Sequence, residues 1–164
     1  NILRVFIGAE NADSVYDTVD TIQTNIDDMN PQFYDHVMEL LFAEGAKDVF
    51  FTPVMMKKNR PATLLTVLCS PAHTQHLSKL ILTETSTLGV RITSSKRILL
   101  ERKIKSMETV WGDVRVKLHI DNNHIVSMSP EYDDCRKIAL AHNIPLSNIY
   151  EQVKLQAQKK FADS

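Results

Sequence analysis

Residues 48–69 of the chain are DVFFTPVMMKKNRPATLLTVLC, and the fold that the sequence predicts is built around them. Residues 48–56 are rich in β-branched and aromatic side chains, which indicates a strand, and Pro53 favours an edge position or a bulge. Residues 63–69 form a nearly continuous apolar run, typical of a strand buried on both faces. The polar residues 57–61 lie between the two runs. The segment is therefore predicted to form two adjacent strands joined by a charged loop.

Helices are predicted on both sides of this segment. Asn30-Pro31 places an N-cap amide before a proline at the first helical position, and Gly45 is a typical C-terminal end. Ser70-Pro71 repeats the start signal. Apolar residues recur at helical spacing in both segments, at Phe33, Val37, Leu40 and Leu41 and at Leu77, Leu80 and Ile81.

Two more strands complete the pattern. Residues 21–26 alternate before the first helix, and Leu88, Val90 and Ile92 alternate after the second. The order β-α-β-β-α-β predicts a ferredoxin-like plait over residues 21–100, in which two helices cover one face of an antiparallel sheet. The fold class is therefore α+β.

The ends of the chain have a different pattern. Residues 2–7 form a short apolar strand, and residues 9–20 carry acids without a base, which favours a linker. In residues 101–164, Val114, Val116, Leu118 and Ile120 alternate with polar residues and predict the middle strand of a three-stranded meander. Two helices follow, opening at Ser129-Pro130 and at Ser147. The predicted division is residues 1–20, 21–100 and 101–164.

Composition excludes several classes of protein. The 164 residues are 43% hydrophobic and 24% charged, which is typical of a globular protein and not of a disordered or fibrous one. The formal net charge of -1 lacks the basic excess of a protein that coats nucleic acid or an acidic membrane. No apolar run approaches the roughly 18–20 residues of a membrane helix. We expect neither nucleic acid nor membrane as a partner.

Two further observations concern cellular context. Cys69 and Cys135 lie far apart in apolar patterns, which favours two buried thiols in a reducing compartment, and hence the cytoplasm. The first residue is Asn1 rather than Met, and no signal sequence precedes it, so we expect a piece of a longer chain.

The loop of Lys57, Lys58, Asn59 and Arg60 is the first candidate site. Three cations within four residues repel one another unless an anion lies among them, and arginine with lysine suits a phosphate chain. A solvated hairpin tip is the alternative.

Residues 84–91 are the second candidate, with Glu84, Thr85, Thr87, Gly89 and Arg91 as its main members. Hydroxyl groups and exposed amides at such a turn can accept an anion. Alternatively, the hydroxyl groups satisfy the last carbonyls of the preceding helix.

Asp27 and Asp28 form the third candidate, at the predicted junction of a strand and a helix. Two carboxylates there could hold magnesium or manganese, provided that the backbone turns, because successive side chains of an extended strand point to opposite faces. An acidic helix start that complements the helix dipole is the alternative.

Seven strings together resemble the C-terminal domain of the nickel-insertion proteins of nickel-pincer nucleotide biosynthesis, the cofactor of lactate racemase. They are residues 24–31 (TNIDDMNP), 48–53 (DVFFTP), 56–61 (MKKNRP), 64–69 (LLTVLC), 84–91 (ETSTLGVR), 111–117 (WGDVRVK) and 130–136 (PEYDDCR). The resemblance covers nearly everything from residue 21 onward, in order and with sensible spacing.

The resemblance implies a CTP-dependent cyclometallase of the lyase class. Such an enzyme inserts Ni2+ into pyridinium-3,5-bisthiocarboxylic acid mononucleotide and consumes CTP with Mn2+ or Mg2+. It also implies a PII-like fold in a homotrimer or hexamer, and a partner in the missing N-terminal domain of the same protein. Taken with the three candidate segments, this predicts that Asp27 and Asp28 bind the metal and that CTP is bound by Lys57, Lys58, Asn59, Arg60, Glu84, Thr85, Thr87, Gly89 and Arg91. No residue is assigned to catalysis.

Two other functions fit the same residues. A plait with an anion-binding loop could sense a nucleotide without converting it, and conversion of CTP to CMP and pyrophosphate discriminates the two. A purely structural oligomerisation domain would bind no nucleotide.

Overall fold

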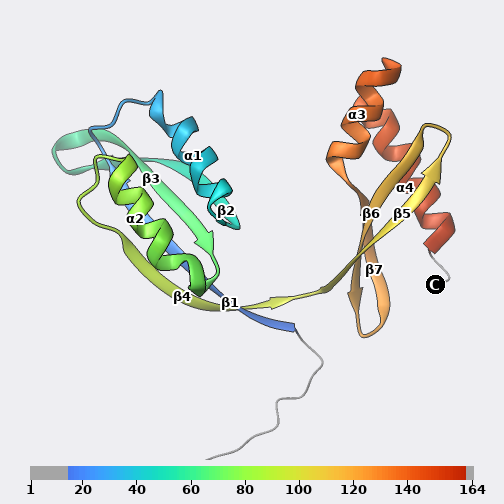
Figure 1. The fold of residues 1–164 in the computed structure, drawn as a ribbon, viewed down its shortest axis with the longest axis horizontal. Helices are drawn as coiled ribbons and strands as arrows, with labels where there is room; N and C mark the ends of the chain where they lie inside the picture. The colour runs from blue at the N-terminus through green and yellow to red at the C-terminus, as the bar shows by residue number, and fades with distance from the viewer. Residues whose placement is uncertain (1–14, 162–164) are drawn as a thin grey trace, which may run out of the picture. The chain divides into compact units, whose positions relative to one another are not determined.

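A computed structural model describes residues 15–161, which fall into two compact units, residues 16–98 and the chain from Leu99 onward (Figure 1). The strand expected at residues 2–7 lies outside the described residues. Each unit has its own sheet and its own hydrophobic core. None of the described helices is long and apolar enough to cross a membrane.

The first unit has the predicted mixed α+β architecture. Its elements are β1 (Val15–Ile26), α1 (Phe33–Ala43), β2 (Asp48–Met56), the 3-10 turn η1 (Lys57–Asn59), β3 (Arg60–Cys69), the 3-10 turn η2 (Pro71–His73), α2 (Thr74–Glu84) and β4 (Arg91–Leu99). The sheet order is β2-β3-β1-β4, and β3 is antiparallel to both β1 and β2. This order is consistent with a ferredoxin-like plait.

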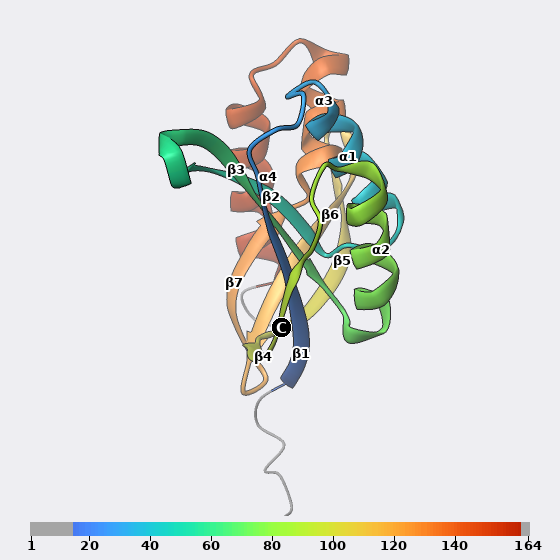
Figure 2. The same cartoon turned by 90° about the vertical axis from the view of Figure 1, so that its left-hand side faces the viewer.

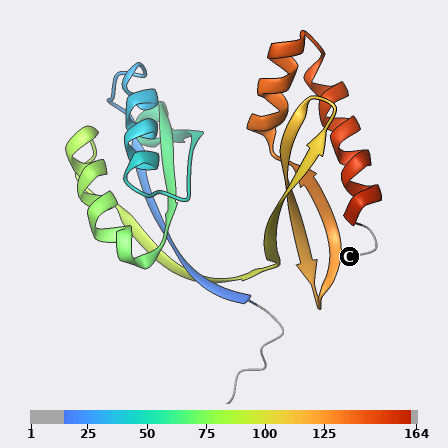
Figure 3. The ribbon, with the colours of Figure 1, turned by 45° about the vertical axis from the view of Figure 1, so that its right-hand side comes forward.

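One face of this sheet is covered by α1 and α2 (Figure 3). Val37 and Leu41 of α1 and Leu77 and Ile81 of α2 pack on alternate residues of the strands, Ile22, Ile26, Val49, Leu65, Val67 and Cys69. Alternate residues of a strand point to the same face, so the strand residues share one face of the sheet. Residues three or four apart lie on one side of a helix, so the buried residues of α1 and α2 can face that sheet. Pro53 lies on the edge strand β2, as its missing N–H requires.

Strand β1 begins earlier than the sequence predicted. Residues 15–20, interpreted as part of an acidic linker, form its first half. Asp17 accepts hydrogen bonds from Lys47 Nζ at 2.9 Å and Arg97 Nη2 at 2.6 Å, and these two cations lower the pKa of Asp17 to about 2. The linker interpretation was wrong because the bases that neutralise this acid lie 30 and 80 residues away in the sequence.

Asp20, also on β1, is buried and bonded to neighbouring elements. It accepts hydrogen bonds from the hydroxyl groups of Ser94 on β4 and Thr74 on α2, the latter at 2.6 Å. These bonds, with Ser94 contributing most, lower the pKa of Asp20. A buried carboxylate is tolerated where it is fully hydrogen-bonded. Asp20 therefore ties β1 to both β4 and α2.

Strand β4 begins later than predicted. The alternation of Leu88, Val90 and Ile92 indicated a strand over these residues, but the strand starts at Arg91, and the side chains of Leu88 and Ile92 are exposed. Residues 85–90 instead form an irregular connection after α2.

The second unit is the predicted meander with two helices. Its elements are β5 (Glu101–Thr109), β6 (Gly112–Asp121), β7 (His124–Pro130), α3 (Tyr132–His142) and α4 (Leu146–Phe161). The sheet order β5-β6-β7 confirms β6 as the middle strand. Asn122 and Asn123 join β6 to β7 with φ of 47° and 62°, as expected of a tight hairpin turn. Ser129-Pro130 ends β7 rather than opening the helix, which starts two residues later.

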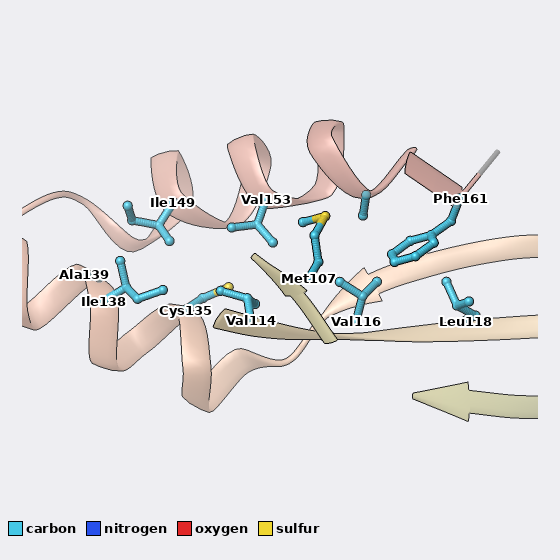
Figure 4. Packing of buried hydrophobic residues seen from close by; sticks show 11 residues of the cluster. Met107, Val114, Val116, Leu118, Cys135, Ile138, Ala139, Ile149, Val153 and Phe161 are labelled. Atoms are coloured by element: carbon cyan, nitrogen blue, oxygen red, sulfur yellow. The ribbon is translucent and has the colours of Figure 1, made fainter. Parts of the chain in front are cut away.

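The core of this unit lies between the sheet and the two helices. Figure 4 shows Val114, Val116 and Leu118 of β6 facing α4, which contributes Ile149, Val153 and Phe161. Cys135 is buried in this core and Cys69 in that of the first unit, both as free thiols, and burial raises the pKa of Cys135. The cytoplasmic location inferred from these thiols stays a prediction.

The start of α3 is fixed to β6 by two ion pairs, Lys117 with Glu131 at 2.8 Å and Arg115 with Asp134. Arg115 Nε and Nη2 donate to Asp134 Oδ2 and Oδ1, both at 2.8 Å, and the Arg115 backbone N–H donates to Oδ2 at 3.1 Å. The Arg115 side chain holds the pKa of Asp134 at about 2 and raises its own.

We predict that Asp134→Asn lowers the thermal midpoint at pH 7. A depressed pKa in the folded state stabilises the fold above the unfolded pKa of roughly 3.9, and this contribution is lost as the pH falls toward about 2. The difference between variant and parent should therefore shrink from pH 4 to pH 2 in thermal scans. Asp133→Asn, in the same helical turn, is the control, and an equal effect of both variants would contradict the assignment.

Candidate functional site

The C-terminal end of β1 brings the three candidate segments together. Three polar side chains at and just after this end, those of Asn25, Asp27 and Asp28, each contact a segment distant in sequence. Asn25 Oδ1 accepts a hydrogen bond from Arg91 Nη2 at 2.6 Å, and Asp27 Oδ2 accepts one from Arg60 Nη1 at 3.1 Å. Asp28 accepts one from the hydroxyl group of Ser86. The predicted anion loop, the predicted hydroxyl-rich turn and the predicted metal ligands are therefore neighbours.

Sheet order explains this convergence. Because β1 is paired with β3 on one side and lies beside β4 on the other, its end lies between the start of β3 and the start of β4. Ile26 is opposite Thr63, three residues after Arg60. On the other side, the Asn25–Arg91 and Asp17–Arg97 contacts show that β4 runs opposite to β1.

The charged loop forms the tip of the β2–β3 hairpin, which extends away from the helices (Figure 2). Lys58 and Asn59 have φ of 60° and 57°, in the left-handed region, so the backbone reverses over two residues. All four side chains from Lys57 to Arg60 are exposed. Among the described residues, Arg60 has an acidic partner, while Lys57 and Lys58 make no ion pair.

The turn after α2 is organised by its hydroxyl groups. Thr85 Oγ1 donates to the carbonyl of Ile81 at 2.7 Å, which is the helix-capping role that the sequence left open. Thr87 Oγ1 donates to the carbonyl of Gly89 at 3.0 Å, and the buried Thr24 of β1 donates to the same carbonyl at 2.9 Å. A Cβ at Gly89 would meet no atom within 4 Å, so packing within the chain does not require a glycine there. Glu84 lies 3.9 Å from His36 Nε2.

Asp27 and Asp28 lie where the chain leaves β1 and bends, as a shared metal site requires. In this structure, however, they contact different segments, Asp27 the hairpin and Asp28 the turn after α2. No group of three histidine, cysteine, aspartate or glutamate side chains among the described residues could hold a metal. The pair therefore offers at most two protein ligands, which is the number that a nucleotide-bound Mg2+ usually takes, with phosphate oxygens completing the shell. The residues present fit such a metal.

Sequence reasoning did not find the contacts that position these side chains. Asn25 and Ser86 lie within the candidate segments but were given no role of their own, although Ser86 holds Asp28 and Asn25 holds Arg91. Thr24, which is only 2% exposed, links β1 to the turn after α2. The string TNIDDMNP contains two of these residues, so the local concentration of polar groups at the end of a strand was the available signal.

Comparison with known proteins identifies relatives along nearly the whole chain. The sequence model of the nickel insertion protein family matches residues 1–150. The pyridinium-3,5-bisthiocarboxylic acid mononucleotide nickel insertion proteins of Acetivibrio thermocellus and Thermotoga petrophila are 47% and 42% identical over 154 and 153 residues. Each alignment covers 93% of this chain and 38% of the relative, so the chain spans less than half of those proteins.

Solved structures agree with these matches. LarC2, described as the C-terminal domain of a cyclometallase involved in the synthesis of the NPN cofactor of lactate racemase, is 40% identical with a TM-score of 0.80. The match covers 87% of this chain and 99% of LarC2. A protein from Methanopyrus kandleri has the same fold, at 22% identity with a TM-score of 0.68, over 88% of this chain and 90% of its own. The chain belongs to the nickel insertion protein family, and the part of the family that it matches is the C-terminal domain.

Proposed function

We propose that this chain is the part of a nickel insertase that binds CTP and its divalent metal. The whole enzyme would insert Ni2+ into pyridinium-3,5-bisthiocarboxylic acid mononucleotide while CTP is hydrolysed, as a nickel cyclometallase of the lyase class. The observation that carries the proposal is the convergence of Arg60, Asp27, Asp28 and Arg91 at the end of β1. The names of the relatives support the nickel chemistry, and the convergence supports the nucleotide site.

The charges at this site suit a triphosphate with a cation. Lys57, Lys58, Arg60 and Arg91 would bind the phosphate oxygens, because guanidinium groups bind phosphate in a bidentate manner and ammonium groups add point charges. Asn59, Glu84, Thr85, Thr87 and Gly89 complete the proposed nucleotide contacts. Asp27 and Asp28 would hold Mn2+ or Mg2+, which when bound neutralises charge between carboxylates and phosphates.

A nucleotide-sensing or oligomerisation module without catalysis is the second candidate. It is favoured by the exposed cations of the loop at Lys57 and Lys58, which could hold a nucleotide without converting it. Incubating the full-length protein that contains this domain with CTP and Mn2+ and measuring CMP and pyrophosphate separates the two functions, because the proposed insertase as a whole hydrolyses CTP. Release of both products supports the insertase, and binding without products supports the module.

We predict that Lys58→Ala and Arg60→Ala each weaken CTP binding by an order of magnitude or more. Each charge-assisted hydrogen bond to a phosphate contributes about 1.5–3 kcal/mol, and 1.4 kcal/mol is a factor of about ten. Isothermal titration calorimetry in the presence of Mn2+ measures the effect. Lys79→Ala, which removes a cation from α2, is the control. Unchanged affinity in both loop variants would exclude this loop as the phosphate site.

We predict that Asp28→Asn reduces the gain in CTP affinity that Mn2+ provides. The substitution keeps the size of the side chain and removes the charge that a hard cation requires. The thermal midpoint without ligand should stay nearly unchanged, which shows that the fold is intact. If Mn2+ raises CTP affinity as much in Asp27→Asn and Asp28→Asn as in the parent, the two acids bind no metal and only hold Arg60 and Ser86.

We also propose that the sheet face opposite α1 and α2 is an interface in a homotrimer or hexamer. Phe50 and Thr66 are paired on this face, where Phe50 is 42% exposed and Thr66 only 3%. We predict a trimer or hexamer by light scattering at micromolar concentration, dissociated by Phe50→Glu. Phe42→Glu is the control, because Phe42 lies on α1 with a similar exposure of 45%. A monomeric parent would contradict the proposal.

A further inference from the structure

Arg60 and Asp27 are assigned to different ligands, the nucleotide and its metal, yet they contact each other. A single hydrogen bond of 3.1 Å joins Arg60 Nη1 to Asp27 Oδ2. The pair is accessible, with the Arg60 side chain 53% exposed and that of Asp27 20% exposed. Both groups can therefore exchange partners without disturbing the core.

The chemistry of the two partners makes them competitors with the ligands. A guanidinium group binds carboxylate and phosphate oxygens with the same planar fork, so Asp27 takes a place on Arg60 that a phosphate oxygen could take. In the same way, a cation coordinated by Oδ2 of Asp27 competes with the hydrogen bond that this oxygen accepts from Arg60. Asp28 differs, because its partner is the uncharged hydroxyl group of Ser86.

We propose that Asp27 is a positioning residue that holds Arg60 in place of phosphate until the divalent cation binds. Asp27 then exchanges Arg60 for the cation, and Arg60 is released toward the phosphates of the nucleotide. This inference rests on the proposed nucleotide site and concerns the coupling within it. Cation and nucleotide then favour each other's binding by the same factor. Because the Arg60 side chain is 53% exposed and water screens its charge, that part of the coupling is small, about two- to fivefold.

The inference gives Asp27→Asn opposite effects with and without metal. In EDTA, the variant frees Arg60 and should bind CTP about two- to fivefold more tightly than the parent. With saturating Mn2+, it should bind CTP more weakly, because a metal ligand is lost. A residue that only maintained the fold would change both affinities in the same direction.

A double-mutant cycle separates release of Arg60 from simple removal of negative charge. CTP affinity in EDTA is measured for the parent, Asp27→Asn, Arg60→Gln and the double variant. If Asp27 acts through Arg60, Asp27→Asn has little effect in the Arg60→Gln background. Asp28→Asn, which removes the same charge and leaves Arg60 bonded, should increase affinity less than Asp27→Asn does.

Titration with Mn2+ alone provides an independent measurement by reciprocity. Arg60→Gln should raise Mn2+ affinity about two- to fivefold, because Asp27 loses its competing partner. An equal gain from Asp27→Asn in both backgrounds, or Mn2+ affinity unchanged by Arg60→Gln, overturns the inference. A parent that binds no CTP with or without Mn2+ overturns the proposed function itself, and the coupling with it.

Discussion

The central position of β1 is the constraint on which the first unit depends. β1 pairs with β3 from Asp20 to Ile26 and lies beside β4, so its end lies between two other strands. Its inward residues support the core, with Ile22 and Ile26 buried under the helices. Its polar residues fix the flanking elements, since Asp17 binds Lys47 and Arg97, and Asp20 binds Thr74 and Ser94. The candidate site follows from this position, because the end of β1 lies between the hairpin, which contacts Asp27, and the turn after α2, which contacts Asp28.

The elements that the sequence predicted well are those with a local cause. β2 has its predicted bounds, Asp48–Met56, because β-branched and aromatic residues are dense within it. The end of α1 was predicted from Gly45, whose φ of +95° few other residues adopt readily. The alternation in β6 predicted both its strand type and its buried face, from Val114 to Ile120. Each of these signals lies within about ten residues of the feature that it predicts.

The features that the sequence did not predict depend on distant residues. The first half of β1 looked like a linker because its acids have no local base. The start of β4 was misplaced because Leu88 and Val90 alternate like a strand, although Thr24 and Thr87 hold the chain there in an irregular turn. The three candidate segments were each recognised from their residue types. Their contacts through Arg60, Ser86 and Arg91 follow from sheet order, which local periodicity does not contain.

Two arginine–aspartate pairs show that the number of hydrogen bonds, rather than the residue types, determines whether an ion pair is fixed or can change partners. Asp134 accepts three hydrogen bonds from Arg115, one of them from the backbone, and its side chain is 14% exposed. If Asp134 gave up Arg115 for another partner, the guanidinium group and the backbone N–H of Arg115 would lose their hydrogen bonds together. Leaving several polar groups unpaired is costly in free energy. Asp27 accepts one hydrogen bond from an arginine that lies beside a hairpin tip. Only one contact has to be replaced there, and a phosphate or a cation can replace it. The first pair is therefore suited to fixing a helix on a sheet, and the second to changing partners.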